Sequence, residues 1–170
     1  MMIYLGLFFI LLALLLLLLS KRQRSEVGLP AGRVIYSDTR AWGKVEEPFY
    51  DAMLGLTGKP DYLVEQNGVS IPIEVKSGWA PPEPYEGHIY QLAAYCLLVQ
   101  HITGKRPPYG LLHYRNRTFA IDFTPELESS LTDLLVEMRL QDKHGEADRS
   151  HEEPMRCARC GYRSNCDQRL

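Results

Sequence analysis

The sequence predicts a mixed α/β fold, in which helices flank a β-sheet, with one further apolar helix at the N-terminus. Two β-hairpin patterns and two amphipathic helix patterns alternate along the chain, and this order favours a sheet covered by helices. The first hairpin turns at Asn67-Gly68, a pair typical of type I′ turns, which need positive φ at both positions. An apolar content of 45% is sufficient for a packed core.

The N-terminal stretch Met1–Leu19 contains no charged residue. About 20 apolar residues suffice to cross a bilayer as a helix. The first basic residues, Lys21, Arg22 and Arg24, follow this stretch. We therefore expect residues 1–20 to be an uncleaved single-pass membrane anchor, with the body in the cytoplasm according to the positive-inside rule. A cleaved signal peptide is the alternative, although no typical small-residue cleavage site is visible.

The remainder divides into a polar linker at 21–33, a folded core at 34–141, and a polar linker with a cysteine-containing tail at 142–170. Within the core we expect a weak strand at Arg33–Thr39 and a short helix at Glu46–Leu56.

The second half of the core predicts a helix at Glu86–His101 and a second hairpin at Tyr109–Phe123, which turns near Asn116-Arg117. Thr124 followed by Pro125 is typical of a helix start. The helix that begins there is expected to reach Gln141, and one apolar stripe along it contains Leu127, Leu131, Leu134, Leu135 and Met138.

The formal net charge of −2 argues against a protein that binds nucleic acid mainly through a basic surface. Any nucleic-acid contact must come from local patches or from a bound cation. A nuclease is still compatible with this charge, because catalytic carboxylates lower it.

The first hairpin carries a candidate metal site. Counting outward from Asn67-Gly68 places Asp61 opposite Glu74, with Lys76 on the same face. Two carboxylates opposite each other destabilise a sheet unless a cation lies between them, and Mg²⁺ suits one or two carboxylates. A solvated polar face is the alternative for each residue alone. The opposite face is apolar and predicted to be core: Tyr62, Val64, Ile71, Ile73 and Val75.

Three polar residues share one face of the helix that follows: His88, Gln91 and Tyr95. A Gln and a Tyr on a mainly apolar helix are also common as boundary residues, so they gain meaning only beside the hairpin carboxylates.

With these residues, the sequence resembles the PD-(D/E)XK nuclease superfamily, and within it the RecB-like exonucleases of CRISPR systems, the "Cas-four" group. The motif G-x-P-D appears as Gly58-Lys59-Pro60-Asp61, E-x-K as Glu74-Val75-Lys76, and Q-x-x-x-Y as Gln91 to Tyr95. The likeness covers roughly Val34 to Leu170.

The resemblance implies a restriction-endonuclease-like core that cleaves DNA with Mg²⁺ or Mn²⁺, mainly at single-stranded ends. It implies that Asp61, Glu74 and the Val75 backbone carbonyl hold the metal and that Lys76 acts in catalysis. It also implies that Gln91, Tyr95 and His88 contact substrate, and that the partners are proteins of CRISPR adaptation or DNA repair. The competing hypotheses are a non-catalytic, membrane-anchored DNA-binding or scaffold protein, and a regulatory protein whose cysteine tail senses redox state or metal.

Two features depart from the related nucleases. The resemblance implies a 4Fe-4S cluster at Cys157, Cys160 and Cys166, but the only other cysteine is Cys96, on the packed side of a helix. The spacing equally suits Zn²⁺ completed by a His or an outside ligand, or three free thiols. Relatives also place a metal-binding His before the Asp. All five histidines here follow Lys76, so Glu46 or Glu47 is the substitute to consider.

Overall fold

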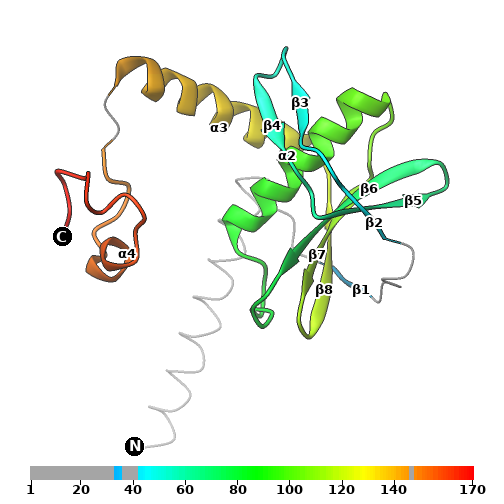
Figure 1. Cartoon of the computed structure of the whole chain (residues 1–170), viewed down its shortest axis with the longest axis horizontal. Coiled ribbons are helices and arrows are strands. Elements are labelled where there is room, and N and C mark those ends of the chain that lie inside the picture. The colour runs from blue at the N-terminus through cyan, green and yellow to red at the C-terminus, as the bar shows by residue number, and fades with distance from the viewer. Residues whose placement is uncertain (1–32, 36–41, 146–147) are drawn as a thin grey trace, which may run out of the picture. The chain divides into compact units, whose positions relative to one another are not determined.

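The computed structural model describes residues 33–35, 42–145 and 148–170, and for 33–35 the backbone alone (Figure 1). The chain forms two compact units, Met1–Thr132 and Asp133–Leu170. The first contains the sheet and the helix that covers it. The second contains the cysteine tail.

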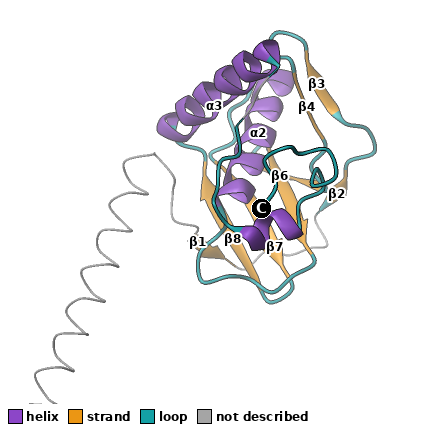
Figure 2. Cartoon of the chain, turned by 90° about the vertical axis from the view of Figure 1, so that its left-hand side faces the viewer, coloured by secondary structure: helices purple, strands orange, loops and turns teal. Residues whose placement is uncertain are grey.

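A mixed sheet of six strands forms the centre of the first unit, as predicted. All of its neighbouring pairs are antiparallel except β6–β7, which is parallel. Parallel strands need a crossover connection, and α2 (Glu86–Thr103) supplies it. Figures 1 and 2 show α2 lying along β6 and β7, which it contacts. The strands, in spatial order, are β1 (Arg33–Ile35), β8 (Arg117–Asp122), β7 (Tyr109–Tyr114), β6 (Val69–Lys76), β5 (Tyr62–Gln66) and β2 (Gly43–Lys44).

The β5–β6 hairpin has the predicted turn and register. Asn67 and Gly68 have φ values of 53° and 72°, as a type I′ turn requires. The ladder pairs Gln66 with Val69 and continues to Tyr62 with Ile73. Since the residues flanking a two-residue turn form a hydrogen-bonded pair, alternate pairs such as Leu63–Pro72 are not hydrogen-bonded. The missing N–H of Pro72 therefore costs this ladder nothing.

Each face of the sheet has its own set of buried side chains. On the face away from α2, the buried residues Val64, Ile71, Ile73, Leu111 and Ala120 form one cluster, with Trp42, Tyr62, Val69 and Tyr109 packed against it. The predicted core face is thus confirmed, except for Val75, which is 37% exposed. The pairing of β6 with β5 ends at Ile73, which lies opposite Tyr62. Val75 is two residues beyond this pair and has no neighbouring β5 residue beside it.

The face toward α2 permits a close approach of helix and sheet at Gly110. A Cβ atom added there would lie 2.6 Å from Cγ of Leu92. Glycine at this strand position therefore lets α2 pack directly on β7, and this fixes where the polar residues of α2 meet the end of β6.

The predicted helix at Glu46–Leu56 is wrong. This segment forms a small hairpin of β3 (Phe49–Asp51) and β4 (Leu56–Gly58). Its turn is closed by a hydrogen bond from the Leu54 backbone N–H to Asp51 Oδ1 (2.8 Å) and contains Gly55 at φ 52°. An Asp side chain bonded to a nearby backbone N–H and a glycine with positive φ are both typical of turns, and neither occurs in the interior of a regular helix.

The other predicted elements are confirmed with shifted ends. The helix α2 runs two residues beyond the expected His101 and ends at Gly104, which has a left-handed φ of 69°. The β7–β8 hairpin turns one residue earlier than expected, between Tyr114 and Arg117. The helix α3 (Pro125–His144) begins where predicted, and Thr124 Oγ1 accepts a hydrogen bond from the Leu127 N–H. In the tail, α4 spans Pro154–Ala158.

No helix within the described ranges is long and apolar enough to cross a membrane. The predicted anchor at residues 1–20, and the linker as far as residue 32, lie outside those ranges. The expected strand at Arg33–Thr39 corresponds to β1 over its first three residues, and the remainder also lies outside them.

Candidate active site

Glu74 and Lys76 lie at the end of β6, on the face covered by α2. Glu74 is only 8% exposed, although it is a carboxylate. A buried charge is costly unless it is paired and hydrogen-bonded, and Glu74 is both. Its Oε1 lies 2.9 Å from Lys76 Nζ and accepts a second hydrogen bond from Gln91 Nε2 (3.0 Å).

Gln91 connects these groups to each other and to Tyr95. Its Oε1 accepts a hydrogen bond from Lys76 Nζ (2.8 Å), and its Nε2 donates both to Glu74 and to the Tyr95 hydroxyl (2.8 Å). Glu74, Lys76, Gln91 and Tyr95 thus form one connected network, here called the carboxylate–lysine network. The structure brings together all four of these residues, which the sequence had placed on two separate elements.

Asp61 reaches the same place by a different route from the predicted one. The ladder ends at Tyr62–Ile73, one residue short of a direct pair with Glu74. Instead, Asp61 Oδ2 accepts a hydrogen bond from the Val75 backbone N–H (2.7 Å), between Glu74 and Lys76. Burial raises the pKa of Tyr95, the hydrogen bond from Gln91 opposes this, and the charges of Glu74 and Asp61 raise it further. Both carboxylates therefore act on the same hydroxyl.

The position of Pro60 leaves one backbone carbonyl free at this site. Continuing the alternation of the hairpin, Val75 would form a hydrogen-bonded pair with Pro60. Proline has no N–H to donate, so the Val75 carbonyl receives no ladder hydrogen bond from β5. The Val75 N–H, which points to the same side of the strand, is taken by Asp61. The Val75 carbonyl is therefore directed toward Asp61 and is available as a ligand.

Gly58 allows Tyr95 to take its place beside β4. A Cβ atom added at Gly58 would lie 2.9 Å from Cε1 of Tyr95 and 3.0 Å from Cδ1 of Leu98. Gly58 and Pro60 were part of the sequence motif, but the sequence alone assigned them no role. Their roles depend on which helix packs against β4 and on where β5 begins.

His88 lies next to the network and is not hydrogen-bonded to it. Its Nδ1 is 2.8 Å from the Tyr114 hydroxyl. Burial lowers the pKa of His88, and the positive charge of Lys76 lowers it further. The contact between His88 and substrate that the resemblance implies stays a prediction.

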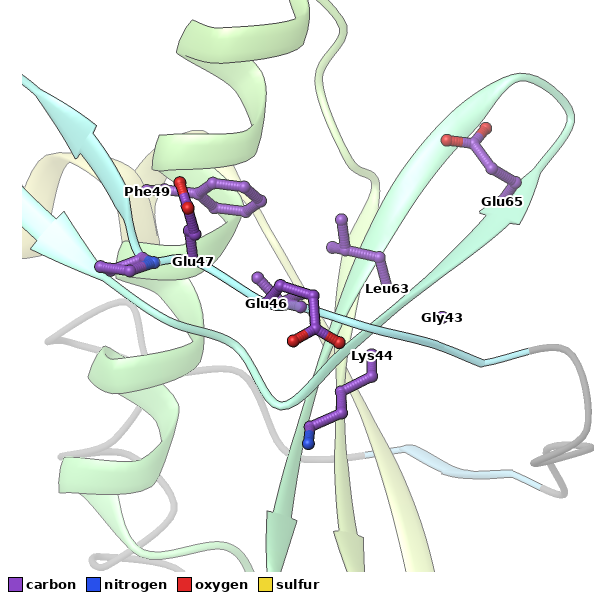
Figure 3. A pocket seen from close by; sticks show the side chains of 9 residues that line it. Gly43, Lys44, Glu46, Glu47, Phe49, Leu63 and Glu65 are labelled. Atoms are coloured by element: carbon purple, nitrogen blue, oxygen red, sulfur yellow. The ribbon is translucent and has the colours of Figure 1, made fainter.

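Glu46 and Glu47 line a pocket of about 690 Å³ together with residues of β2 and β5. Figure 3 shows their carboxylates directed to different sides of the chain, with Glu65 on the hairpin arm. The described residues contain no group of three or more His, Cys, Asp or Glu side chains arranged to hold a metal. Glu46 and Glu47 are therefore not brought together with Asp61 and Glu74. The pocket lining consists of Gly43, Lys44, Val45, Glu46, Glu47, Pro48, Phe49, Leu63 and Glu65.

The donors at the end of β6 fit a hard divalent cation of low protein coordination. Asp61 Oδ1 and Glu74 Oε2 take no part in the hydrogen bonds described above, and the Val75 carbonyl is free of the β5 ladder. Mg²⁺ typically takes one or two carboxylates and completes its shell with water and substrate phosphate. Two carboxylates and one carbonyl match this requirement without a third acidic residue.

The cysteine tail belongs to the second unit. Cys157 is buried and its Sγ accepts a hydrogen bond from the Leu170 N–H (3.5 Å), while Cys160 is exposed. These two and Cys166 line one cavity of about 390 Å³ together with His151. In the first unit, Cys96 is buried in α2 and burial raises its pKa, as expected for a small apolar core residue. The structure does not arrange the tail thiols as a metal-binding group.

A mixed sheet flanked by helices, with two carboxylates and a lysine at adjoining strand ends, defines a restriction-endonuclease-like nuclease core. The family model described as the PD-(D/E)XK nuclease superfamily matches residues 14–167, and the chain belongs to this superfamily. Membership indicates a metal-dependent nuclease that acts on DNA, with Mg²⁺ or Mn²⁺ as the typical metal.

Among solved structures, the chain is similar to the one described as "Crystal structure of SSO0001". The identity is 16% and the TM-score 0.43, over 93% of this chain and 69% of the other. No curated protein matches the chain.

Proposed function

We propose that the protein is a Mg²⁺- or Mn²⁺-dependent DNA exonuclease that hydrolyses phosphodiester bonds at single-stranded ends. The observation that carries this proposal is the carboxylate–lysine network, joined to Asp61 through the Val75 backbone. A structural ion pair needs Glu74 and Lys76 only. Asp61 brings a second carboxylate to the same strand end, and two carboxylates are what a Mg²⁺ site typically requires.

Asp61, Glu74 and the Val75 carbonyl would hold the metal in this proposal. The bound ion would polarise the phosphoryl group and lower the pKa of a coordinated water. Lys76, Gln91 and Tyr95 would lie beside the phosphate, and the hydrogen bonds that join them to Glu74 support this arrangement.

Lys76 would stabilise charge on the phosphate or orient the attacking water. Its ammonium has three N–H donors, and Glu74 and Gln91 each accept one. The third is available for a phosphate oxygen or for water. Because Gln91 is held in turn by Tyr95, the lysine does not need to reorganise when negative charge develops, which is the condition for strong electrostatic stabilisation.

The test uses the full-length chain in detergent with end-labelled single-stranded DNA and Mn²⁺. We expect the labelled strand to be degraded, and circular single-stranded DNA of the same length to survive. Asp61→Asn keeps an oxygen that can accept the Val75 N–H, yet removes the charge, so the fold persists. We expect this variant and Lys76→Ala to lose at least 100-fold in rate, on the order of what a single catalytic group contributes.

Lys44→Ala is the matched control, since Lys44 is exposed on β2 and absent from the network. Its rate should equal that of the parent chain. Degradation that persists unchanged in Asp61→Asn and Lys76→Ala would rule out this active site.

A non-catalytic, membrane-anchored DNA-binding or scaffold protein is the second candidate. It is favoured by the fact that the described residues contain no group of three or more His, Cys, Asp or Glu side chains arranged to hold a metal. In that case single-stranded DNA would bind with equal affinity with and without Mn²⁺ and would remain intact.

We also propose that residues 1–20 anchor the protein in the cell membrane with the nuclease body in the cytoplasm, where CRISPR adaptation or DNA repair would supply its substrates. The absence of charge from Met1 to Leu19 and the basic residues after it support this. Carbonate washing of membranes should leave the full chain in the pellet. Release of the protein into the supernatant would contradict the proposed membrane anchor.

For the tail, we propose a metal held by Cys157, Cys160 and Cys166, as Zn²⁺ or as an iron–sulfur cluster. The shared cavity and the presence of His151 in its lining support zinc, which accepts three thiolates and one imidazole. Metal analysis and an absorbance spectrum after anaerobic purification separate the two, and a metal-free protein would contradict both.

A further inference from the structure

The segment between β6 and α2 carries two exposed aromatic side chains beside the site. Trp79 is 72% exposed and Tyr85 is 60% exposed. Trp79 is the third residue after Lys76, and Tyr85 directly precedes α2, which bears Gln91. Single exposed aromatics are common on protein surfaces. Two on one short segment next to a reaction centre are a feature that needs an explanation.

The backbone around Trp79 is held by the β7–β8 turn. The Gly78 carbonyl accepts a hydrogen bond from the Arg115 N–H (3.2 Å), and the Ala80 N–H donates to Asn116 Oδ1 (2.8 Å). These bonds fix the residue before Trp79 and the residue after it, while the indole stays in solvent. The exposed Arg115 therefore lies on the strand turn that is bonded to this segment.

Tyr85 rests on a series of aromatic rings that leads into the core. Its ring and that of His88 form a T-shaped pair with centroids 5.4 Å apart. The centroids of His88 and Tyr114 are 6.0 Å apart, and those of Tyr114 and the buried Phe119 are 5.9 Å apart. The hydrogen bond between His88 and Tyr114 fixes the middle of this series. A ring held in this way loses little conformational entropy when a ligand stacks on it.

We propose that Trp79 and Tyr85 form a stacking platform for the unpaired bases of the DNA strand that enters the active site, with Arg115 contacting its backbone. This proposal rests on the proposed nuclease function, because that function requires the DNA strand to run toward the active site. Glu83 and Glu86 flank Tyr85 and repel phosphates, so attraction at that end comes from the ring face. Base stacking on aromatic rings is tolerant of sequence and requires bases that are not paired.

The two tryptophans of the chain allow a direct test. Trp42 packs against the rings of Tyr62 and His113 at 5.6 and 5.1 Å, so Trp42→Phe is a mild change that leaves Trp79 as the only indole. The full-length variant, kept in EDTA to prevent cleavage, is titrated with oligothymidylate. We expect the emission of Trp79 to be quenched, and blunt duplex DNA of equal length to quench it far less.

Affinity measured by anisotropy of a labelled oligothymidylate gives the second readout. Trp79→Ala and Tyr85→Ala should each weaken binding about 10-fold, in line with the loss of one stacked base, and Trp79→Phe should lose less. Tyr50→Ala is the matched control: Tyr50 is 67% exposed, on β3, and should bind like the parent. Unquenched Trp79, equal quenching by duplex, or parental affinity in Trp79→Ala would overturn the platform.

The outcomes for the two proposals can be told apart. Quenching and aromatic-dependent affinity without any cleavage in Mn²⁺ would support the stacking platform and contradict the nuclease. Cleavage that depends on Asp61, with unchanged affinity in Trp79→Ala and Tyr85→Ala, would support the nuclease and overturn the platform.

Discussion

Among single residues, the site depends on uncharged residues as well as on its carboxylates and lysine. Gly58 is one, because Tyr95 occupies the space where any side chain would lie. We expect Gly58→Ala to displace Tyr95, whose hydroxyl holds Gln91, and so to loosen the contact between Gln91 and Lys76. DNA cleavage should fall about 10-fold or more, as small misplacements of catalytic groups do, while metal binding at Asp61 and Glu74 is retained.

The control for Gly58→Ala is Tyr95→Phe, which removes the hydroxyl without adding bulk beside β4. It should reproduce the loss of rate if the effect passes through the hydrogen bond to Gln91. An unchanged rate in Gly58→Ala would mean that Tyr95 yields without cost and that its position is not critical.

At the scale of elements, α2 connects the fold to the site because it both packs the sheet and carries Gln91. It packs tightly on the sheet at Gly110, where a Cβ would meet the Leu92 side chain at 2.6–2.9 Å. Gly110→Ala should lower the free energy of unfolding by about 1–3 kcal/mol, as overpacking of a core does. Urea denaturation followed by circular dichroism measures this.

Gly87→Ala is the matched change within α2. Nothing lies within 4 Å of a Cβ added there, and the residue is helical. Alanine has the higher helix propensity, so the variant should be more stable by up to about 1 kcal/mol. Equal stability of the two variants would show that α2 shifts freely on β7.

The elements that could be predicted from the sequence are those specified by local chemistry. The pair Asn67-Gly68 determines a turn type and thereby a register, and Thr124-Pro125 marks a helix start. The hairpin β3–β4 could not be predicted in this way. Its strands have three residues each, and they are stabilised by packing against α2, which is distant in the sequence.

The sequence predicted which residues form the candidate site better than it predicted how they are arranged. Glu74 and Lys76 share a face because strand alternation requires it. The route of Asp61 to the Val75 N–H depends instead on β5 beginning at Tyr62, and the exposure of Val75 has the same cause. Where a strand begins is determined by its neighbours as well as by its own residues. The position of Asp61 and the exposure of Val75 therefore could not be predicted from the sequence alone.

At the scale of the whole molecule, a bound metal should stabilise the fold, because the ligands come from strands that are separate in the unfolded chain. At a concentration 100 times its Kd, a ligand that binds only the folded state adds about 2.7 kcal/mol. For a domain of this size that corresponds to a rise in Tm of several degrees, at about 2–4 °C per kcal/mol. Thermal unfolding of the full-length chain should therefore move upward with Mn²⁺ and return with EDTA.

The variants that test this separate the site from general effects of a divalent cation. Asp61→Asn should unfold at nearly the parental Tm without metal, since an amide oxygen can still accept the Val75 N–H, yet should gain nothing from Mn²⁺. Glu65→Gln removes an exposed carboxylate on β5 that lies in the pocket near Glu46, and should keep the full response. If Mn²⁺ stabilised Asp61→Asn as much as the parent, the metal would bind elsewhere, and the converging carboxylates of Asp61 and Glu74 would be structural.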